Sequence, residues 1–153
     1  MDRGRLATLK AEIDNQMELI EEIYKKIEKR QANFKENDVG IESMAYQLHN
    51  LYSAYEELFE IVADYFENEI EGVKYHSDLL HRMKMEIEGI RPPLISKELC
   101  QLFDELRRFR HFFRHAYNIE LNPEKIEDIL NISLQIRSKF KNELEHFLKA
   151  LSK

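Results

Sequence analysis

The stretch that decides the fold is residues 97–117, KELCQLFDELRRFRHFFRHAY. Its apolar side chains recur at intervals of three and four, which places them on one face of an α-helix. That face consists of Leu99, Leu102, Phe103, Leu106, Phe109, Phe113 and Ala116. Arginine and histidine occupy the other face, and Ser96 stands where an N-cap is needed. The pattern therefore predicts a helix over 97–117 with an apolar side that faces a core and a separate polar set of arginines and histidines.

Two longer helices are predicted before it. Residues 5–33 and residues 41–68 each carry apolar side chains at threes and fours with charged side chains between them. The polar segment 35–40 separates them, and Asn37 or Asp38 within it can cap the second helix. The first half of the chain is therefore expected to be helical almost throughout.

A short helix and a non-helical connection are predicted next. Ser77 can cap a helix that ends at Met85 or Ile87. Residues 89–93 cannot remain helical, because their two consecutive prolines disfavour helical geometry and have no N–H to donate. The acidic run at residues 67–71 indicates a solvated helix end.

The last element completes a bundle. Residues 118–122 form a predicted turn, after which Asn122 can cap, and Pro123 can begin, a helix that runs to about residue 151. The chain then has four major helices and a short fifth. Their most direct arrangement is an all-α, up-and-down bundle.

Composition agrees with this fold class and limits the function. The 153 residues, with 4 Gly, 3 Pro and no Trp, favour one helical domain spanning residues 1–153. A formal net charge of −6 argues against a protein that coats nucleic acid through bulk charge. The single cysteine, Cys100, cannot form an intrachain disulfide and is expected to be a buried small residue. We find no signal peptide and no membrane-spanning run. We therefore expect a cytoplasmic protein that does not bind a membrane.

Residues 107–117 concentrate the chemistry of the chain. They hold four arginines and two histidines among aromatic residues, within an otherwise acidic protein. Arg110 is followed five residues later by His115 and seven residues later by Tyr117. A fixed cation beside an imidazole is what phosphodiester cleavage needs without a metal. The arginine stabilises the charge that builds on the phosphate, and the histidine moves a proton near neutral pH.

The pattern resembles the HEPN superfamily, in particular the HepT-like toxins of bacterial toxin–antitoxin pairs. The signature there is an Arg, a polar residue, a short spacer, a His, one residue and a Tyr; here Arg110, His111, His115 and Tyr117 fill those places. The flanking segments, residues 79–83, 89–93, 106–117 and 120–123, are similar as well. The resemblance covers roughly residues 40–150 and implies the same helical bundle.

The resemblance implies a metal-independent endoribonuclease without a cofactor. His115 is expected to act as general base or acid for attack by the ribose 2′-OH, which selects RNA over DNA. Arg110 would stabilise the phosphoryl group, and His111 would orient the scissile group. The phosphates of the RNA, messenger or transfer, are expected to contact Arg107, Arg108 and Arg114.

The resemblance also implies two protein partners. The working site of such toxins lies where two subunits of a homodimer meet. The antitoxin is a small nucleotidyltransferase that attaches AMP to the signature tyrosine, here Tyr117, and the added anion would repel RNA. On an ideal helix Arg110 and His115 point roughly 140° apart, so they meet only if the helix loosens near His115 or the arginine reaches around.

Other interpretations stay open at this point. Arginines in a last helical turn also offset the helix dipole, and Tyr117 also suits the edge of a core. His111 and His115 have the spacing of a helical metal pair, but no third ligand is evident, so no metal is expected. Glu56 could orient a cleft arginine. The alternative function is a catalytically silent HEPN-type bundle that binds RNA or a protein; a third is a helical adaptor with a basic patch for an acidic partner.

Overall fold

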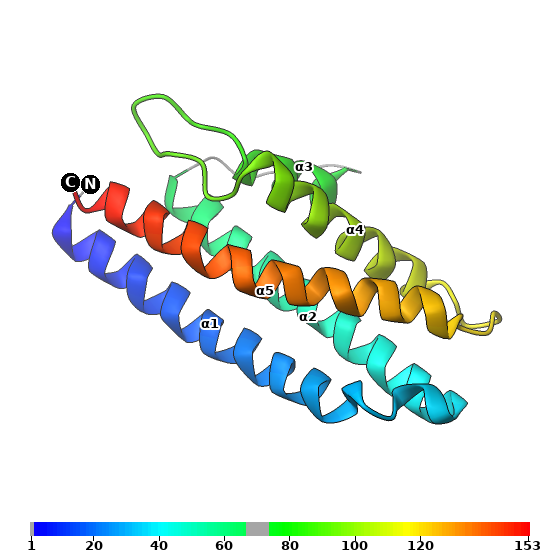
Figure 1. Cartoon of the computed structure of the whole chain (residues 1–153). Coiled ribbons are helices and arrows are strands. Elements are labelled where there is room, and N and C mark those ends of the chain that lie inside the picture. Colours follow the sequence, from blue (N-terminus) through cyan, green and yellow to red (C-terminus); the bar gives the residue numbers. More distant parts are fainter. Residues whose placement is uncertain (1, 67–73) are drawn as a thin grey trace.

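The structure is a computed structural model and describes residues 2–66 and 74–153 (Figure 1). Within these ranges its elements are all helical. They are α1 (Arg3–Gln31), the 3-10 turn η1 (Phe34–Glu36), α2 (Asp38–Phe66), α3 (Tyr75–Met83), α4 (Lys97–Arg114) and α5 (Pro123–Leu151). The predicted all-α bundle is confirmed. The expected acidic helix end at residues 67–71, and the last two residues of the expected second helix, lie outside the described residues.

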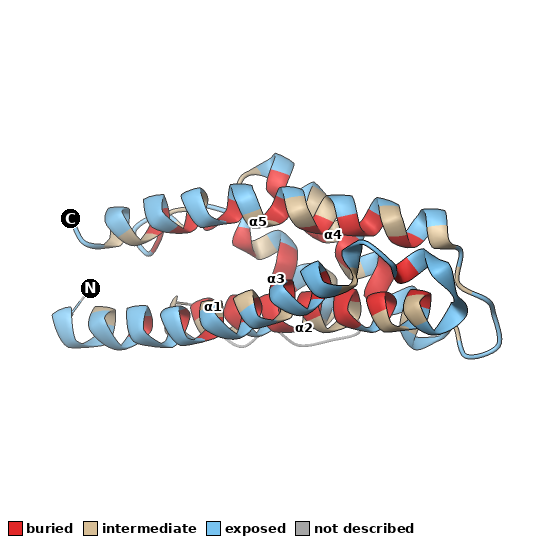
Figure 2. Cartoon of the chain, turned by 60° about the horizontal axis from the view of Figure 1, so that its bottom comes forward, coloured by how far each residue is buried: buried red, intermediate tan, exposed pale blue. Residues whose placement is uncertain are grey.

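The three long helices run side by side, and the shorter α3 and α4 cover one side of them (Figure 1). α2 is the central helix, because it packs against α1, α3, α4 and α5. The two termini lie at one end of the molecule, and the turn from α4 to α5 lies at the other (Figures 1 and 2). Figure 2 shows that the buried residues lie on the sides of the helices that face one another. This up-and-down arrangement follows from the short turns at Asn37 and Asn122.

An aromatic cluster joins the helices in the middle of the bundle. The Phe103 ring on α4 lies edge to face with Tyr55 and Phe59 of α2, at centroid distances of 4.8 and 5.1 Å, and with Phe140 of α5 at 5.6 Å. All four side chains are buried. Such edge-to-face pairs add to the free energy of burial because ring edges are positive and ring faces negative. Of the predicted core face, Leu99, Phe103, Leu106 and Phe109 are buried, Leu102 and Phe113 are partly buried, and Ala116 lies beyond the end of α4.

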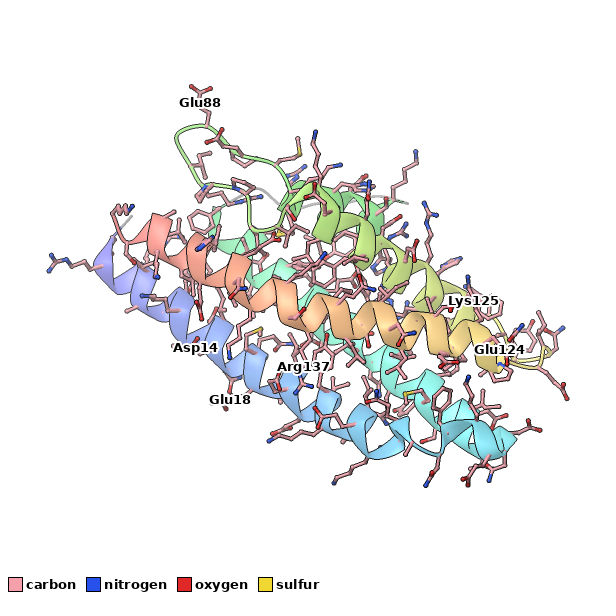
Figure 3. The ribbon with its side chains drawn as sticks, in the orientation of Figure 1. Asp14, Glu18, Glu88, Glu124, Lys125 and Arg137 are labelled. Carbon is pink, nitrogen blue, oxygen red and sulfur yellow. The ribbon has the colours of Figure 1, made fainter. Side chains whose placement is uncertain are left out.

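A second set of contacts holds α5 against α1. The Arg137 side chain lies between the two helices (Figure 3), where it bonds Glu21 at 2.7 Å and pairs with Glu28. Its guanidinium group also lies 4.8 Å from the centroid of the Tyr24 ring. The first and last helices of the chain are thus joined by charge at the surface and by aromatic packing below it.

Three of the predicted helix caps are confirmed. The Asn37 side chain accepts from the Gly40 N–H at 2.8 Å, Ser96 accepts from Leu99 at 3.2 Å, and Asn122 accepts from Glu124 at 2.9 Å. The capping side chain replaces the helical partner that a first-turn N–H lacks. These residues explain why α2, α4 and α5 begin where they do.

The prediction for the short helix was wrong at both ends. Its first residue is Tyr75 and its cap is Lys74, so Ser77 lies inside it. The Asp78 N–H already bonds the Lys74 carbonyl at 2.8 Å, which starts the helix before Ser77. At the other end, α3 stops at Met83, because the Met83 carbonyl accepts from Leu94 and Ile95 of the returning chain.

The loop from α3 to α4 projects from the bundle, with Glu88 at its outer tip (Figure 3). Ile87 and Arg91 pair as an isolated bridge across it. Gly89 between them has φ 76°, a left-handed conformation that side chains disfavour. The segment predicted to be non-helical is therefore a tight turn.

Candidate functional site

Arg110, which belongs to the polar set of the predicted helix, is buried, with 3% of its surface exposed. Its Nη1 and Nη2 donate to the two oxygens of Glu56 at 3.1 and 3.2 Å. Nη1 also lies 3.4 Å from the Ser53 hydroxyl, and the guanidinium group lies 4.8 Å from the centroid of the Tyr52 ring. The two parallel bonds are the bidentate geometry that a carboxylate or a phosphate offers to arginine. The sequence interpretation of Glu56 as the partner of a cleft arginine agrees with this contact.

Two polar atoms beside this pair have no hydrogen-bond partner in the described part of the chain. They are Nε of Arg110 and the hydroxyl of Tyr52, both buried. Burial raises the pKa of Tyr52, and the neighbouring Glu56 charge raises it further. The Tyr52 hydroxyl therefore stays protonated in this interior.

A histidine outside the signature also contacts Arg110. His76, on α3, has its Nδ1 3.0 and 2.9 Å from the two Glu56 oxygens, and Arg110 Nη2 is 3.2 Å from the same nitrogen. Sequence spacing provided no signal for it, because His76 is 34 positions from Arg110. The packing of α3 on α2 brings the two together.

His115 lies at the end of α4 and is exposed. The helix continues through Arg114, and His115 is its C-cap with φ −109° and ψ 6°. Among residues 2–66 and 74–153 no contact joins His115 to Arg110; its ring instead lies edge to face with His111, with centroids 4.8 Å apart. The helix ends at Arg114, so it loosens at His115 as expected, but this does not bring the His115 side chain to Arg110. The predicted helix end at residue 117 is corrected to Arg114.

Arg114 faces α2. Its Nε lies 3.4 Å from His49 Nε2, and His49 Nδ1 lies 3.1 Å from the Asn50 side-chain oxygen. The His49 ring also lies 5.6 Å from Phe113. Burial lowers the pKa of His49, and the positive charges of Arg114 and Arg110 lower it further against the opposing bond from Asn50. His49 is therefore a satisfied, half-buried neighbour of the signature helix.

The two remaining predicted phosphate contacts share one carboxylate. Asp104 accepts from Arg107 Nε at 2.8 Å and pairs with Arg108 Nε at 3.0 Å. The Arg108 side chain is 73% exposed, whereas the Arg107 side chain is 20% exposed. The Asp104 side chain is 15% exposed, so of the two arginines Arg108 is the one that solvent, and hence an anion, reaches.

Tyr117 projects into solvent from the turn after α4, with 90% of its surface exposed. The alternative that it lies at a core edge is therefore wrong. Cys100 is buried as expected, and its burial raises the pKa of the thiol. In the part of the chain that the structure describes, no three His, Cys, Asp or Glu side chains gather into a metal-binding group.

The chain is thus an all-α bundle in which Arg-x4-His-x-Tyr lies at the end of α4. The sequence model of the family described as HepT-like protein matches residues 43–151, most of the chain. The chain therefore belongs to the HepT-like family. This is a HEPN-type toxin family, generally of ribonucleases, whose members act in toxin–antitoxin systems. No curated protein and no solved structure matches the chain. None of the described helices is long and apolar enough to cross a membrane.

Proposed function

We propose that the protein is a metal-independent endoribonuclease toxin of a bacterial toxin–antitoxin pair, acting in the cytoplasm. The observation that carries the proposal is the exposed end of α4. There the imidazoles of His111 and His115 lie 4.8 Å apart, and Tyr117 is 90% exposed two residues further on. Exposed imidazoles beside arginines suit proton transfer on an anionic substrate, and the exposed phenol suits covalent modification.

In the reaction the ribose 2′-OH attacks the adjacent phosphorus, and the bond from phosphorus to the 5′-oxygen breaks. His115 acts as general acid or base, and His111 orients the scissile group beside it. Arg110 stabilises the phosphoryl charge. In the described chain both of its outer nitrogens bond Glu56, so a phosphate oxygen would take over one of these bonds. Arg107, Arg108 and Arg114 bind neighbouring phosphates without reading the base sequence.

Regulation involves two partners. A second copy of the chain completes the cleft at the signature helix, and a nucleotidyltransferase antitoxin attaches AMP to Tyr117. The added phosphate would lie at the histidine pair, where it excludes the RNA backbone by like charge and bulk. The exposure of Tyr117 supports this proposal, because the enzyme that modifies it needs access to the hydroxyl.

The test is cleavage of cellular RNA in EDTA by the unmodified protein, with its mass checked for added AMP. We expect wild type to cut and His115→Ala to be inactive. His146→Ala, an exposed histidine on α5, is the matched control and should cut like wild type. Equal cutting by His115→Ala and wild type would refute the assignment of His115.

One observation favours a second candidate, a catalytically silent bundle that binds RNA or a protein. Arg110 is buried against Glu56, a pairing that neutralises its charge within the fold. A protein of this kind would retain RNA on a filter in EDTA without cutting it, and His115→Ala would bind as wild type does. Cleavage by wild type eliminates this candidate.

A further inference from the structure

The imidazole beside Arg110 belongs to His76, and not to the signature histidine. We propose that His76 is a second proton-transfer residue of the ribonuclease site, held in place by the buried Glu56 carboxylate. The inference deepens the proposed function and rests on it. It concerns a residue on α3, outside the signature of the family.

The shorter contacts of His76 favour hydrogen on Nδ1. Both Glu56 oxygens lie within 3.0 Å of Nδ1, and an ionised carboxylate can only accept. Glu56 is the bidentate partner of Arg110, which is always charged. Arg110 Nη2, which can only donate, lies 3.2 Å from the same nitrogen, but the two Glu56 oxygens are closer, so we assign the hydrogen on Nδ1 to a bond with Glu56. In the neutral ring the lone pair then lies on Nε2.

The free nitrogen faces an accessible surface. Glu56 is buried, with 5% of its surface exposed, whereas the His76 side chain is 46% exposed. Among the described residues none contacts His76 Nε2. A buried carboxylate behind an imidazole whose outer nitrogen is free is the arrangement that orients a histidine for proton transfer.

The surroundings of His76 suit a phosphodiester. Charged groups face it from two elements, Glu56 on α2 and Arg110 on α4, and the Tyr75 ring lies edge to face with it at 5.2 Å. Arg110 Nη2 is 3.2 Å from His76 Nδ1, so a phosphate drawn to that guanidinium group lies against the same imidazole. Among the described contacts of Arg110, the histidine is His76.

Cleavage by the 2′-OH needs two proton transfers. His76 Nε2 takes the proton from the 2′-OH, and the 2′-oxygen forms a bond to phosphorus. The bond from phosphorus to the 5′-oxygen breaks, and His115 of the second copy, which completes the cleft, gives its proton to that oxygen. The products are a 2′,3′-cyclic phosphate and a 5′-hydroxyl, with Glu56 as the positioning residue.

The first experiment compares His76→Gln with His81→Gln in the RNA cleavage assay. Both histidines lie on α3 and are exposed, but only His76 contacts Glu56. We expect His76→Gln to lose about 100-fold or more in rate and His81→Gln to match wild type. Equal rates for His76→Gln and wild type overturn the inference and leave the proposed function standing. An inert wild type free of AMP overturns both.

The second experiment assigns the base. An RNA is made with sulfur in place of the scissile 5′-oxygen, at the position that wild type cleaves. Because a thiolate leaves without a proton, His115→Ala should recover on this substrate and His76→Gln should stay slow. Recovery of His76→Gln overturns its assignment as the base.

A third measurement does not depend on activity. Long-range nitrogen–proton correlation spectra of the folded protein report the tautomer of His76. We expect hydrogen on Nδ1 in wild type and a different signal in Glu56→Gln, whose amide can also donate. Hydrogen on Nε2 in neutral wild type would contradict the contact with Glu56 and overturn the inference.

Discussion

Glu56 on α2 and Arg110 on α4 meet in the interior through two hydrogen bonds of 3.1 and 3.2 Å, and each side chain is at least 93% buried. Removing one member of a buried pair leaves the other charge uncompensated. We therefore expect Glu56→Gln to lower the free energy of unfolding by about 3–5 kcal/mol. Urea denaturation measures this.

The control for that prediction is Glu42→Gln, an exposed glutamate on the same helix, which should change stability by less than about 0.5 kcal/mol. The double variant Glu56→Met/Arg110→Met removes both charges and should recover most of the lost stability. Equal losses in the single and double variants would show that packing, and not the unpaired charge, is responsible.

The hydrogen bonds of Tyr24 and Tyr55 predict that Tyr24→Phe lowers stability more than Tyr55→Phe does. The Tyr24 hydroxyl donates to the Ser133 carbonyl at 2.8 Å and lies 2.8 Å from the Tyr55 hydroxyl. Since its hydrogen goes to Ser133, Tyr24 accepts from Tyr55. Tyr24→Phe breaks both bonds and leaves the Tyr55 hydroxyl buried without a partner, at a cost of about 1–3 kcal/mol.

Tyr55→Phe breaks one of these bonds and removes the buried donor with it, so its cost should be about 1 kcal/mol. Thermal denaturation of the two variants under one set of conditions compares them. A larger loss for Tyr55→Phe than for Tyr24→Phe would contradict donation from Tyr55 to Tyr24.

Alkaline pH should unfold the protein. Burial is the main cause that raises the pKa of Tyr24, Tyr52 and Tyr55 above the unfolded value of roughly 10. The neutral side chains are thus favoured in the folded state. Their contribution to stability is complete below about pH 10 and is lost as the pH rises toward the folded pKa values. Tyrosinate absorbance should therefore rise in two phases, the second together with loss of helical circular dichroism. A single phase without unfolding contradicts this.

At Gly40, near the start of α2, we predict that a side chain larger than glycine is not tolerated. A Cβ there would lie 2.6 Å from the Phe34 carbonyl oxygen, a backbone atom that cannot rotate away. Gly40→Ala should therefore destabilise by about 1–3 kcal/mol. At Gly4, in the first turn of α1, the nearest atom would be 3.7 Å away, so Gly4→Ala should be neutral or stabilising. Equal denaturation midpoints for the two variants would show that η1 moves aside.

The proposed modification of Tyr117 can be tested separately from folding. Because its side chain is 90% exposed, Tyr117→Phe should leave the melting temperature unchanged. The variant should gain no AMP when produced with the nucleotidyltransferase antitoxin, whereas wild type and Tyr46→Phe should gain it, as measured by intact mass. Tyr46 is the control because it is also exposed, at 54%. AMP on Tyr117→Phe would place the modification elsewhere.

The fold could be predicted because its information is local. Apolar spacing marked the long helices, and Asn37, Ser96 and Asn122 marked three of their starts. The misplaced α3 shows the limit. Ser77 has the residue type of a cap, but the bond from the Asp78 N–H to Lys74 takes precedence over side-chain preference.

The candidate site could be predicted only in part, because the partners of Arg110 are far from it in the sequence. The signature indicated Arg110 and His115 as a pair, yet helical geometry keeps them on different faces, and α2 and α3 supply the partners of the arginine. The sequence placed Arg110 in the polar set of its helix, away from the core-facing side chains. It is buried because Glu56 neutralises it, and that pairing was foreseeable only as a position on the neighbouring helix.

Arg110 has a proposed role in the reaction and also pairs with Glu56 in the core. Mutations at Arg110 and at His115 should therefore abolish the proposed activity in different ways. A mutation at His115, an exposed helix end, removes chemistry while the bundle remains intact. A mutation at Arg110 strands Glu56 in the core and endangers the fold itself. Cells that escape toxicity should therefore accumulate abundant, well-folded His115 mutants, whereas Arg110 mutants should be found mainly as degraded or aggregated chains.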